Sequence, residues 1–149
     1  MLFMELEGKS YKLGLDNTSY GLYNIGGGML ANIWVFIDER GHSPVLEFLE
    51  SLAAKEMAKA SAYIGELKRQ GHNLRRPLAD YIGHGIYELR PGANRVFYFF
   101  FMGNTAILLH AIRKKTDKLP QRDMELCVKR KRQAEESGKH RNVFPGGLL

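Results

Sequence analysis

The sequence has one cysteine, Cys127, among its 149 residues, so no disulfide bond can form within the chain. Free cysteine is often buried as a small hydrophobic residue, and we expect Cys127 to lie in the core. No uninterrupted apolar stretch approaches the ~18–20 residues of a membrane span. The N-terminus also lacks the basic-then-apolar order of a secretory signal, because Glu5 and Glu7 occur near its start. These absences favour a soluble, cytoplasmic protein with no membrane partner.

Motifs for metals and nucleotide cofactors are missing as well. The five histidines, at positions 42, 72, 84, 110 and 140, form no HExxH motif and no Cys/His pairing at ligand spacing. The triple glycine at 26–28 is not followed by the Lys-Ser/Thr pair of a phosphate-binding loop, and no GxGxxG follows a predicted strand. The sequence therefore predicts neither a metal site nor a cofactor.

Basic residues are in excess, and the excess lies at one end of the chain. Residues 1–110 hold equal numbers of basic and acidic residues, whereas residues 111–149 hold 11 Lys/Arg and 5 Asp/Glu and account for the whole net charge of +6. Such asymmetry is typical of a protein with a polyanionic partner. A solvated basic tail that serves solubility is the alternative explanation.

The length of the chain fits one domain, for which ~150 residues is a typical size. We interpret residues 1–30 as an N-terminal extension, flexible or partly non-native, in which 4–7 and 10–13 alternate weakly and would pair as a hairpin across Gly8. Residues 31–138 form the domain, and residues 139–149 form a C-terminal tail.

The domain begins with an apolar run at 33–37 whose β-branched and aromatic residues are typical of a strand. Two helices follow. Ser43 and Pro44 suit the N-cap and first position of the first helix, and Gly71 suits the end of the second. Apolar residues recur at helical spacing in both, so we expect a helix hairpin with its apolar stripes in the core.

Three strands are predicted next, at 86–90, 95–101 and 105–112, and the short loops between them indicate an antiparallel meander. Pro120 opens a last helix, which we expect to end near Ser137 with Gly138 as its stop. The predicted fold class is α+β, with an antiparallel sheet and the order strand, helix hairpin, three-stranded meander and C-terminal helix.

Two arginines flank the first turn of this meander. Arg90 and Arg95 stand on either side of residues 91–94 and lie within reach of each other. The last strand delivers a basic cluster at its end: Arg113, Lys114 and Lys115. Because guanidinium groups match phosphate oxygens, cations that converge at one sheet edge would bind a phosphate well. The alternative is that Arg90 is a surface residue ion-paired with Glu88.

Cleavage of RNA by its own 2′-hydroxyl needs a proton acceptor, a proton donor and cations that stabilise the phosphorane. His110, Tyr98 and Tyr87 are the candidates for proton transfer, and histidine has the best-matched unperturbed pKa. Each has an alternative interpretation, since His110 and Tyr98 lie in apolar strands and suit the core. Arg90, Arg95, Tyr98, His110 and Lys114 are thus the candidate catalytic set.

An ordered set of motifs adds a resemblance to a known family. These are SPVLEFL at 43–49, GIYELR at 85–90, RVFYF at 95–99 and HAIRKKT at 110–116, with Pro120 opening the last helix. Together they resemble the HigB-type, phage-derived branch of the RelE/ParE toxin superfamily over about residues 32–136. Any one of these pieces alone is weak, whereas their order is fairly specific.

The resemblance implies a RelE-like fold and the toxin of a type II toxin–antitoxin system. Such a toxin is a metal-independent endoribonuclease that cleaves mRNA on the ribosome, and a cognate antitoxin, commonly a helix-turn-helix protein, neutralises it. By position, Arg90 and Arg95 match the phosphate-contacting arginines, and residues 113–115 match the basic end of the last strand. Glu88 is a departure, since RelE toxins carry lysines in that strand, and the motifs do not specify the general base.

Further basic residues are candidates for binding RNA. They are Arg75 and Arg76 in the loop at 73–77, Arg113 and Lys115 beside the candidate site, and Lys129, Arg130, Lys131 and Arg132 in the last helix. We expect reversal of the last four charges to weaken ribosome binding and to leave the fold intact, because contacts to phosphates are electrostatic.

Two other functions are compatible with the same fold, because fold does not decide function. One is a ParE-like inhibitor that binds DNA gyrase without cutting anything. The other is an inactive phage-derived protein that binds RNA or its antitoxin. The basic set around Arg90 and Arg95 favours RNA cleavage over gyrase binding, since a gyrase inhibitor has no need of a phosphate pocket.

Overall fold

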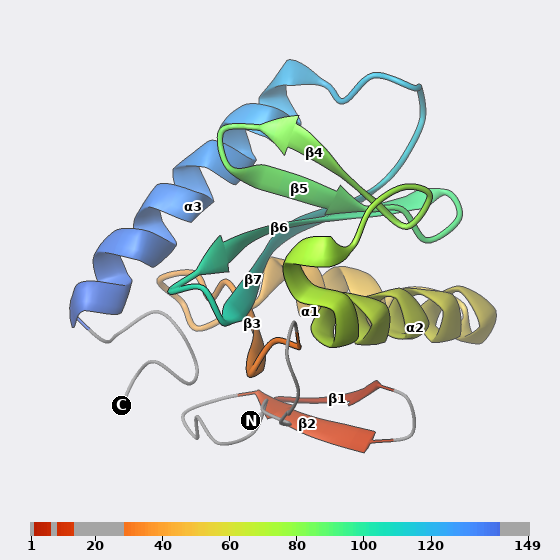
Figure 1. Ribbon diagram of the computed structural model, residues 1–149, viewed down its shortest axis with the longest axis horizontal. Helices are drawn as coiled ribbons and strands as arrows, with labels where there is room; N and C mark the ends of the chain where they lie inside the picture. The colour runs from red at the N-terminus through yellow and green to blue at the C-terminus, as the bar shows by residue number, and fades with distance from the viewer. Residues whose placement is uncertain (1, 7–8, 14–28, 141–149) are drawn as a thin grey trace.

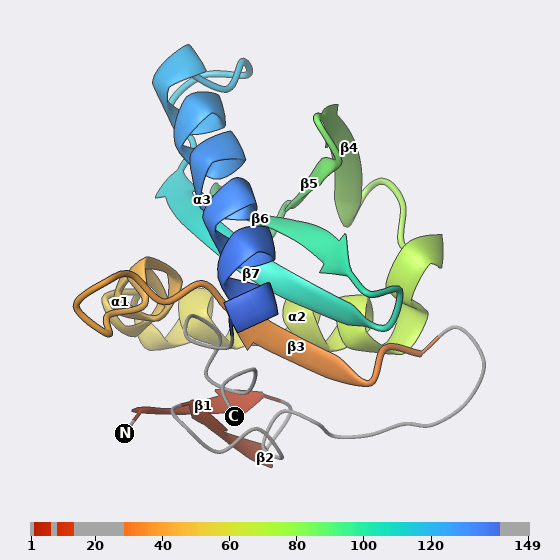
Figure 2. The same cartoon turned by 90° about the vertical axis from the view of Figure 1, so that its left-hand side faces the viewer.

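A five-stranded sheet stands between helices on its two faces (Figures 1 and 2). The computed structural model describes residues 2–6, 9–13 and 29–140, with side chains for residues 29–136. The sheet has the order β3-β7-β6-β5-β4, and its strands are β3 (Asn32–Val35), β4 (Ala79–Gly83), β5 (Ile86–Leu89), β6 (Asn94–Phe101) and β7 (Thr105–Arg113). The helices are α1 (Pro44–Glu50), α2 (Ala54–Gln70), the short 3₁₀ helix η1 (Gly71–Asn73) and α3 (Gln121–His140).

The predicted start of α1 and end of α2 are confirmed. The Ser43 hydroxyl accepts a hydrogen bond from the Leu46 amide at 3.2 Å, and Pro44 occupies the first turn of α1. At the end of α2, Gly71 has a φ of +54°, a conformation that glycine adopts without strain, and its amide bonds the Leu67 carbonyl.

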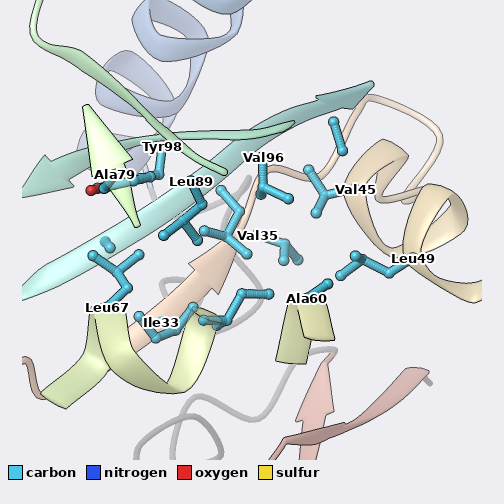
Figure 3. Packing of buried hydrophobic residues seen from close by; sticks show 14 of the residues in the cluster. Ile33, Val35, Val45, Leu49, Ala60, Leu67, Ala79, Leu89, Val96 and Tyr98 are labelled. Atoms are coloured by element: carbon cyan, nitrogen blue, oxygen red, sulfur yellow. The ribbon is translucent and has the colours of Figure 1, made fainter. Parts of the chain in front are cut away.

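Strand alternation divides the core into two layers. Val96 and Tyr98 of β6 point toward α1 and α2, in a cluster that also contains Leu67 and Leu89 (Figure 3). Phe97 and Phe99 point the other way, into a second cluster beneath α3. Cys127 lies in this second layer, fully buried as expected, and burial raises the pKa of its thiol to about 12.

The α+β fold class is confirmed, and the sheet has two features beyond the prediction. Strand β4, at one edge, was not predicted, because Ala-Asp-Tyr-Ile-Gly has little β-branched character and forms a strand only by pairing with β5. Strand β3 pairs parallel to β7, whereas all other pairs of the large sheet are antiparallel.

The expected end of the last helix was wrong. Helix α3 continues through Gly138 to His140, because a single glycine costs a helix only about 1 kcal/mol and does not by itself terminate it. The domain boundary drawn at residue 138 therefore falls inside α3. The N-terminal hairpin is confirmed as β1 (Leu2–Leu6) paired antiparallel with β2 (Lys9–Leu13), and the rest of residues 1–28 lies outside the described residues.

An irregularity in β7 changes the direction of one candidate side chain. Phe97 pairs with His110 and Tyr98 pairs with Leu108, so Leu109 is the extra residue of a β-bulge. Without the bulge, alternation from Leu108 would direct His110 toward α1 and α2. With it, His110 lies on the α3 face, where its ring stacks on Phe97.

Candidate phosphate-binding site

A cleft of about 720 Å³ lies where the ends of β5, β6 and β7 meet the loop that leads into α3. Its walls carry eight Lys and Arg side chains and four Asp and Glu side chains, a net charge of +4. The basic residues are Arg76, Arg90, Arg95, Arg113, Lys114, Lys115, Lys118 and Arg122. The cleft therefore gathers six of the predicted site and RNA-binding residues, together with Lys118 and Arg122.

A partly buried ionic cluster forms one wall of the cleft. The Glu88 carboxylate accepts a hydrogen bond from Arg90 Nη1, and its Oε1 lies 4.0 Å from Arg95 Nε. Arg90 and Arg95 are thus close together across their turn, as predicted. Arg90 is also ion-paired with Glu88, as the alternative interpretation held, but it is only about one-fifth exposed and lines the cleft.

The turn between β5 and β6 holds Arg95 in place. Only 7% of Arg95 is exposed, and its Nη1 donates to the backbone carbonyls of Gly92 and Asn94, each at 2.8 Å. Burial, and then the like charge of Arg90, lower the pKa of the Arg95 guanidinium. A cation fixed in this way needs little reorganisation to meet an anion, which is the arrangement that stabilises developing negative charge.

The rim of the cleft is more exposed and partly ion-paired. Lys114 Nζ lies 2.9 Å from Asp117, and Arg76 lies 2.8 Å from Asp80. A hydrogen bond from the basic partner lowers the pKa of each of these carboxyl groups. Arg113 lies 2.7 Å from Glu56 of α2. Within the described part of the chain, three rim cations have no ion pair: Lys115, Lys118 and Arg122.

Tyr98 and His110 are not brought into the cleft. Tyr98 is 1% exposed within the core layer that faces α1 and α2, and burial raises the pKa of its hydroxyl. His110 Nε2 lies 2.8 Å from Asp123 Oδ1, and burial lowers the pKa of its imidazole. Only Asp123 of this pair lines the cleft. This placement differs from the hypothesis that Tyr98 and His110 transfer protons there, because Tyr98 packs in the core and the His110 ring is held between Asp123 and Arg130 of α3.

The remaining basic candidates have mixed environments. Arg75 donates to the carbonyls of His72 and Leu74 and does not line the cleft. On α3, Lys129 and Arg132 are exposed, whereas Arg130 and Lys131 are partly buried. Lys131 pairs with Glu135 at 3.1 Å.

Arg130 makes three contacts that join α3 to the rest of the fold. Its Nη1 donates a hydrogen bond to the Leu109 carbonyl at 3.0 Å and lies 3.2 Å from His110 Nδ1. Its guanidinium group also lies 5.5 Å from the centroid of the Phe36 ring. The Leu109 carbonyl belongs to the bulge, which has lost regular strand pairing. The expectation that all four α3 charges can be reversed without affecting the fold does not suit Arg130.

We expect Arg130→Ala to lower the free energy of unfolding by about 1.5–3 kcal/mol, the range for hydrogen bonds to charged groups. Arg132→Ala, two residues along the same helix, is the matched control and should change it by no more than about 0.5 kcal/mol, as at exposed surface positions. Urea denaturation followed by circular dichroism measures both. Equal stabilities of the two variants would show that Arg130 has no structural role.

The sequence analysis missed several residues that line the cleft: Asp80, Asp117, Lys118, Arg122 and Asp123. Asp80 lies on the unpredicted strand β4. The others follow the basic cluster at 113–115 and lead into α3, so a usable signal was present. A helix that opens at Pro120 and packs against the sheet must bring the residues just before it, and its first turn, beside the end of β7.

In the described part of the chain, no three His, Cys, Asp or Glu side chains converge as a metal-binding group. None of the helices among these residues has the length and apolar character of a membrane-spanning segment.

The sheet, its helices and the basic cleft define an α+β protein of RelE-like fold. The model of the phage derived protein Gp49-like family (DUF891) matches residues 47–132, more than half of the chain, and the chain belongs to this family, part of the RelE/ParE-like toxin superfamily. Members of this family are commonly toxins of toxin–antitoxin systems. The segment that the family model matches, residues 47–132, contains every residue that lines the cleft. A search of curated proteins found no match.

Proposed function

We propose that this protein is the toxin of a type II toxin–antitoxin system, of the HigB type, and that it cleaves mRNA on the translating ribosome. The observation that carries the proposal is the basic cleft, where Arg90 and Arg95 converge on one carboxylate and rim cations surround them. Family membership supports the toxin class. The proposed partners are mRNA, the ribosome and a cognate antitoxin of helix-turn-helix type.

The reaction we propose is attack of a 2′-hydroxyl on the adjacent phosphate. The bond between the 2′ oxygen and phosphorus forms, the bond from phosphorus to the 5′ oxygen breaks, and a 2′,3′-cyclic phosphate remains. Negative charge develops on the phosphorane oxygens, and preorganised cations stabilise this charge more than that of the ground state. Arg90 and Arg95 are suited to this role, because both lie at the cleft wall and Arg95 is held by the backbone.

Glu88 is the proposed acceptor of the 2′-hydroxyl proton. A general base must lie within hydrogen-bond reach of the proton that it takes, and Glu88 contacts both arginines that would hold the phosphate. The other cleft carboxylates suit the role less well: Asp80 and Asp117 pair with rim cations, and Asp123 is engaged by His110. Lys114, which lies at the cleft rim, is the proposed donor to the departing 5′ oxygen or a further phosphate contact.

A cell-free translation reaction tests the function, with primer extension of the mRNA in the presence and absence of the purified protein. We expect new 5′ ends that appear only while ribosomes translate, and their positions will give the codon preference. A translation inhibitor that empties the ribosomes of mRNA should abolish them. Intact mRNA with unimpaired translation would contradict the proposal, and a supercoiling assay would then separate a gyrase inhibitor from an inactive protein.

A further inference from the structure

A second hollow, of about 460 Å³, lies beside the edge strand β4 and is separate from the cleft. Its walls come from η1, β4, β5, β6 and α3, and most of its large side chains are aromatic: His72, Tyr81, Tyr87 and Phe100. Two of the sequence candidates, Tyr87 and Lys131, lie in this hollow and not in the cleft, and the proposed cleavage chemistry does not use it.

Tyr81 stands out among these aromatic residues. It is 55% exposed and is the one exposed Phe, Tyr or Trp among residues 29–136, whose side chains the structure describes. Its ring packs edge-on against Tyr87 with centroids 5.0 Å apart, and Tyr87 in turn packs against Phe100 at 5.2 Å. The exposed ring is therefore the outer member of a connected aromatic group.

The Tyr81 ring is also held in one orientation. Its hydroxyl accepts a hydrogen bond at 3.0 Å from the amide of Gly85, in the two-residue turn between β4 and β5. Both turn residues, His84 and Gly85, have positive φ, as a tight type I′ hairpin requires. An exposed ring that is fixed in advance loses little conformational entropy when a planar group stacks on it.

Strand β4 places this ring next to the cleft. Asp80 lines the cleft and Tyr81 lines the hollow, because successive side chains of a strand point to opposite faces. Arg76, paired with Asp80, lies on the cleft side, and Lys131 lies in the hollow. Exposed aromatic faces beside cations are the features that bind single-stranded nucleic acid, since every base has a π face.

We propose that Tyr81, supported by Tyr87, is a base-stacking site for a nucleotide next to the phosphate bound in the cleft. This inference rests on the proposed RNA substrate. The RNA strand passes over the β4 edge, with its phosphates on the cleft side and one base on the Tyr81 ring. Stacking on Tyr81 adds affinity that does not depend on salt, whereas the cleft adds affinity that does.

The test measures binding of a single-stranded ten-nucleotide RNA to the full chain by fluorescence anisotropy. The RNA carries 2′-O-methyl sugars, which block the cleavage reaction, and one 2-aminopurine, whose fluorescence falls on stacking. We expect Tyr81→Leu to raise Kd by roughly five- to a hundredfold, the range for loss of one stacked base, with an unchanged salt slope and less 2-aminopurine quenching. Tyr81→Phe, which keeps the ring, should stay closer to the wild type.

Two control variants distinguish a failure of the stacking proposal from a failure of the proposed RNA substrate. Met102→Ala removes another exposed apolar side chain, 81% exposed and outside the hollow, and should leave Kd unchanged. Lys115→Glu/Lys118→Glu reverses two rim charges of the cleft and should weaken binding and lower the salt slope. If this cleft variant loses affinity while Tyr81→Leu binds and quenches like the wild type, the proposed stacking site is wrong. If the wild type binds no RNA and the cell-free translation reaction shows no cleavage, the proposed function fails together with the stacking site.

Discussion

Replacing Glu88 with glutamine is expected to lower kcat for mRNA cleavage by about 10²- to 10⁴-fold, the usual contribution of a general base. Glutamine keeps the shape of the side chain and cannot take the proton of the 2′-hydroxyl. RNA affinity should stay the same or rise, because the substitution removes a negative charge beside Arg90 and Arg95. Single-turnover cleavage on programmed ribosomes, with the protein in excess, separates kcat from binding.

Two controls keep the Glu88 result interpretable. Glu39→Gln removes an exposed carboxylate outside the cleft and should leave kcat unchanged. Loss of one partner from a buried ion pair can destabilise a protein by about 3–5 kcal/mol, so urea denaturation must show that Glu88→Gln remains folded. Glu88→Asp keeps a carboxylate and should recover part of the activity. A folded Glu88→Gln variant with the wild-type kcat would remove Glu88 from proton transfer.

Arg90→Ala is expected to lower kcat/KM for the same reaction by at least tenfold and by up to about 10³-fold, the cost of losing one preorganised charge contact. The guanidinium can donate two parallel hydrogen bonds to a phosphate, so Arg90→Lys should recover only part of the rate. The measurement is again single-turnover cleavage, over a range of protein concentrations.

The matched control for Arg90 is Arg40→Ala, which removes an exposed arginine outside the cleft. It should cleave like the wild type, so a general effect of net charge is distinguished from an effect at the site. An Arg90→Ala variant that cleaves at the wild-type rate would show that Arg90 serves only as the ion-pair partner of Glu88.

Patterns confined to neighbouring residues predicted much of the fold correctly. Ser43 and Pro44 marked the start of α1, and Gly71 marked the end of α2, because caps are satisfied within one helical turn. The strand predicted at 95–101 is present as β6. The proximity of Arg90 and Arg95 followed from a short turn between antiparallel strands.

Features that depend on distant residues were not predictable in this way. Strand β4 has a weak local pattern and forms because β5 supplies its hydrogen-bond partners. Arg130 is indistinguishable in sequence from the basic residues beside it, and only the packing of α3 places it against Leu109 and His110.

By itself, the sequence determined the start of α1, the end of α2, most of the strands and the basic turn that carries Arg90 and Arg95. Tertiary structure alone decided which candidates share a site. It added Lys118 and Arg122 to the cleft, placed Tyr98 in the core, and turned His110 toward α3 through the bulge at Leu109. The physical reason is range: caps and alternation act within a few residues, whereas strand pairing, bulges and helix packing depend on contacts between residues far apart in the chain.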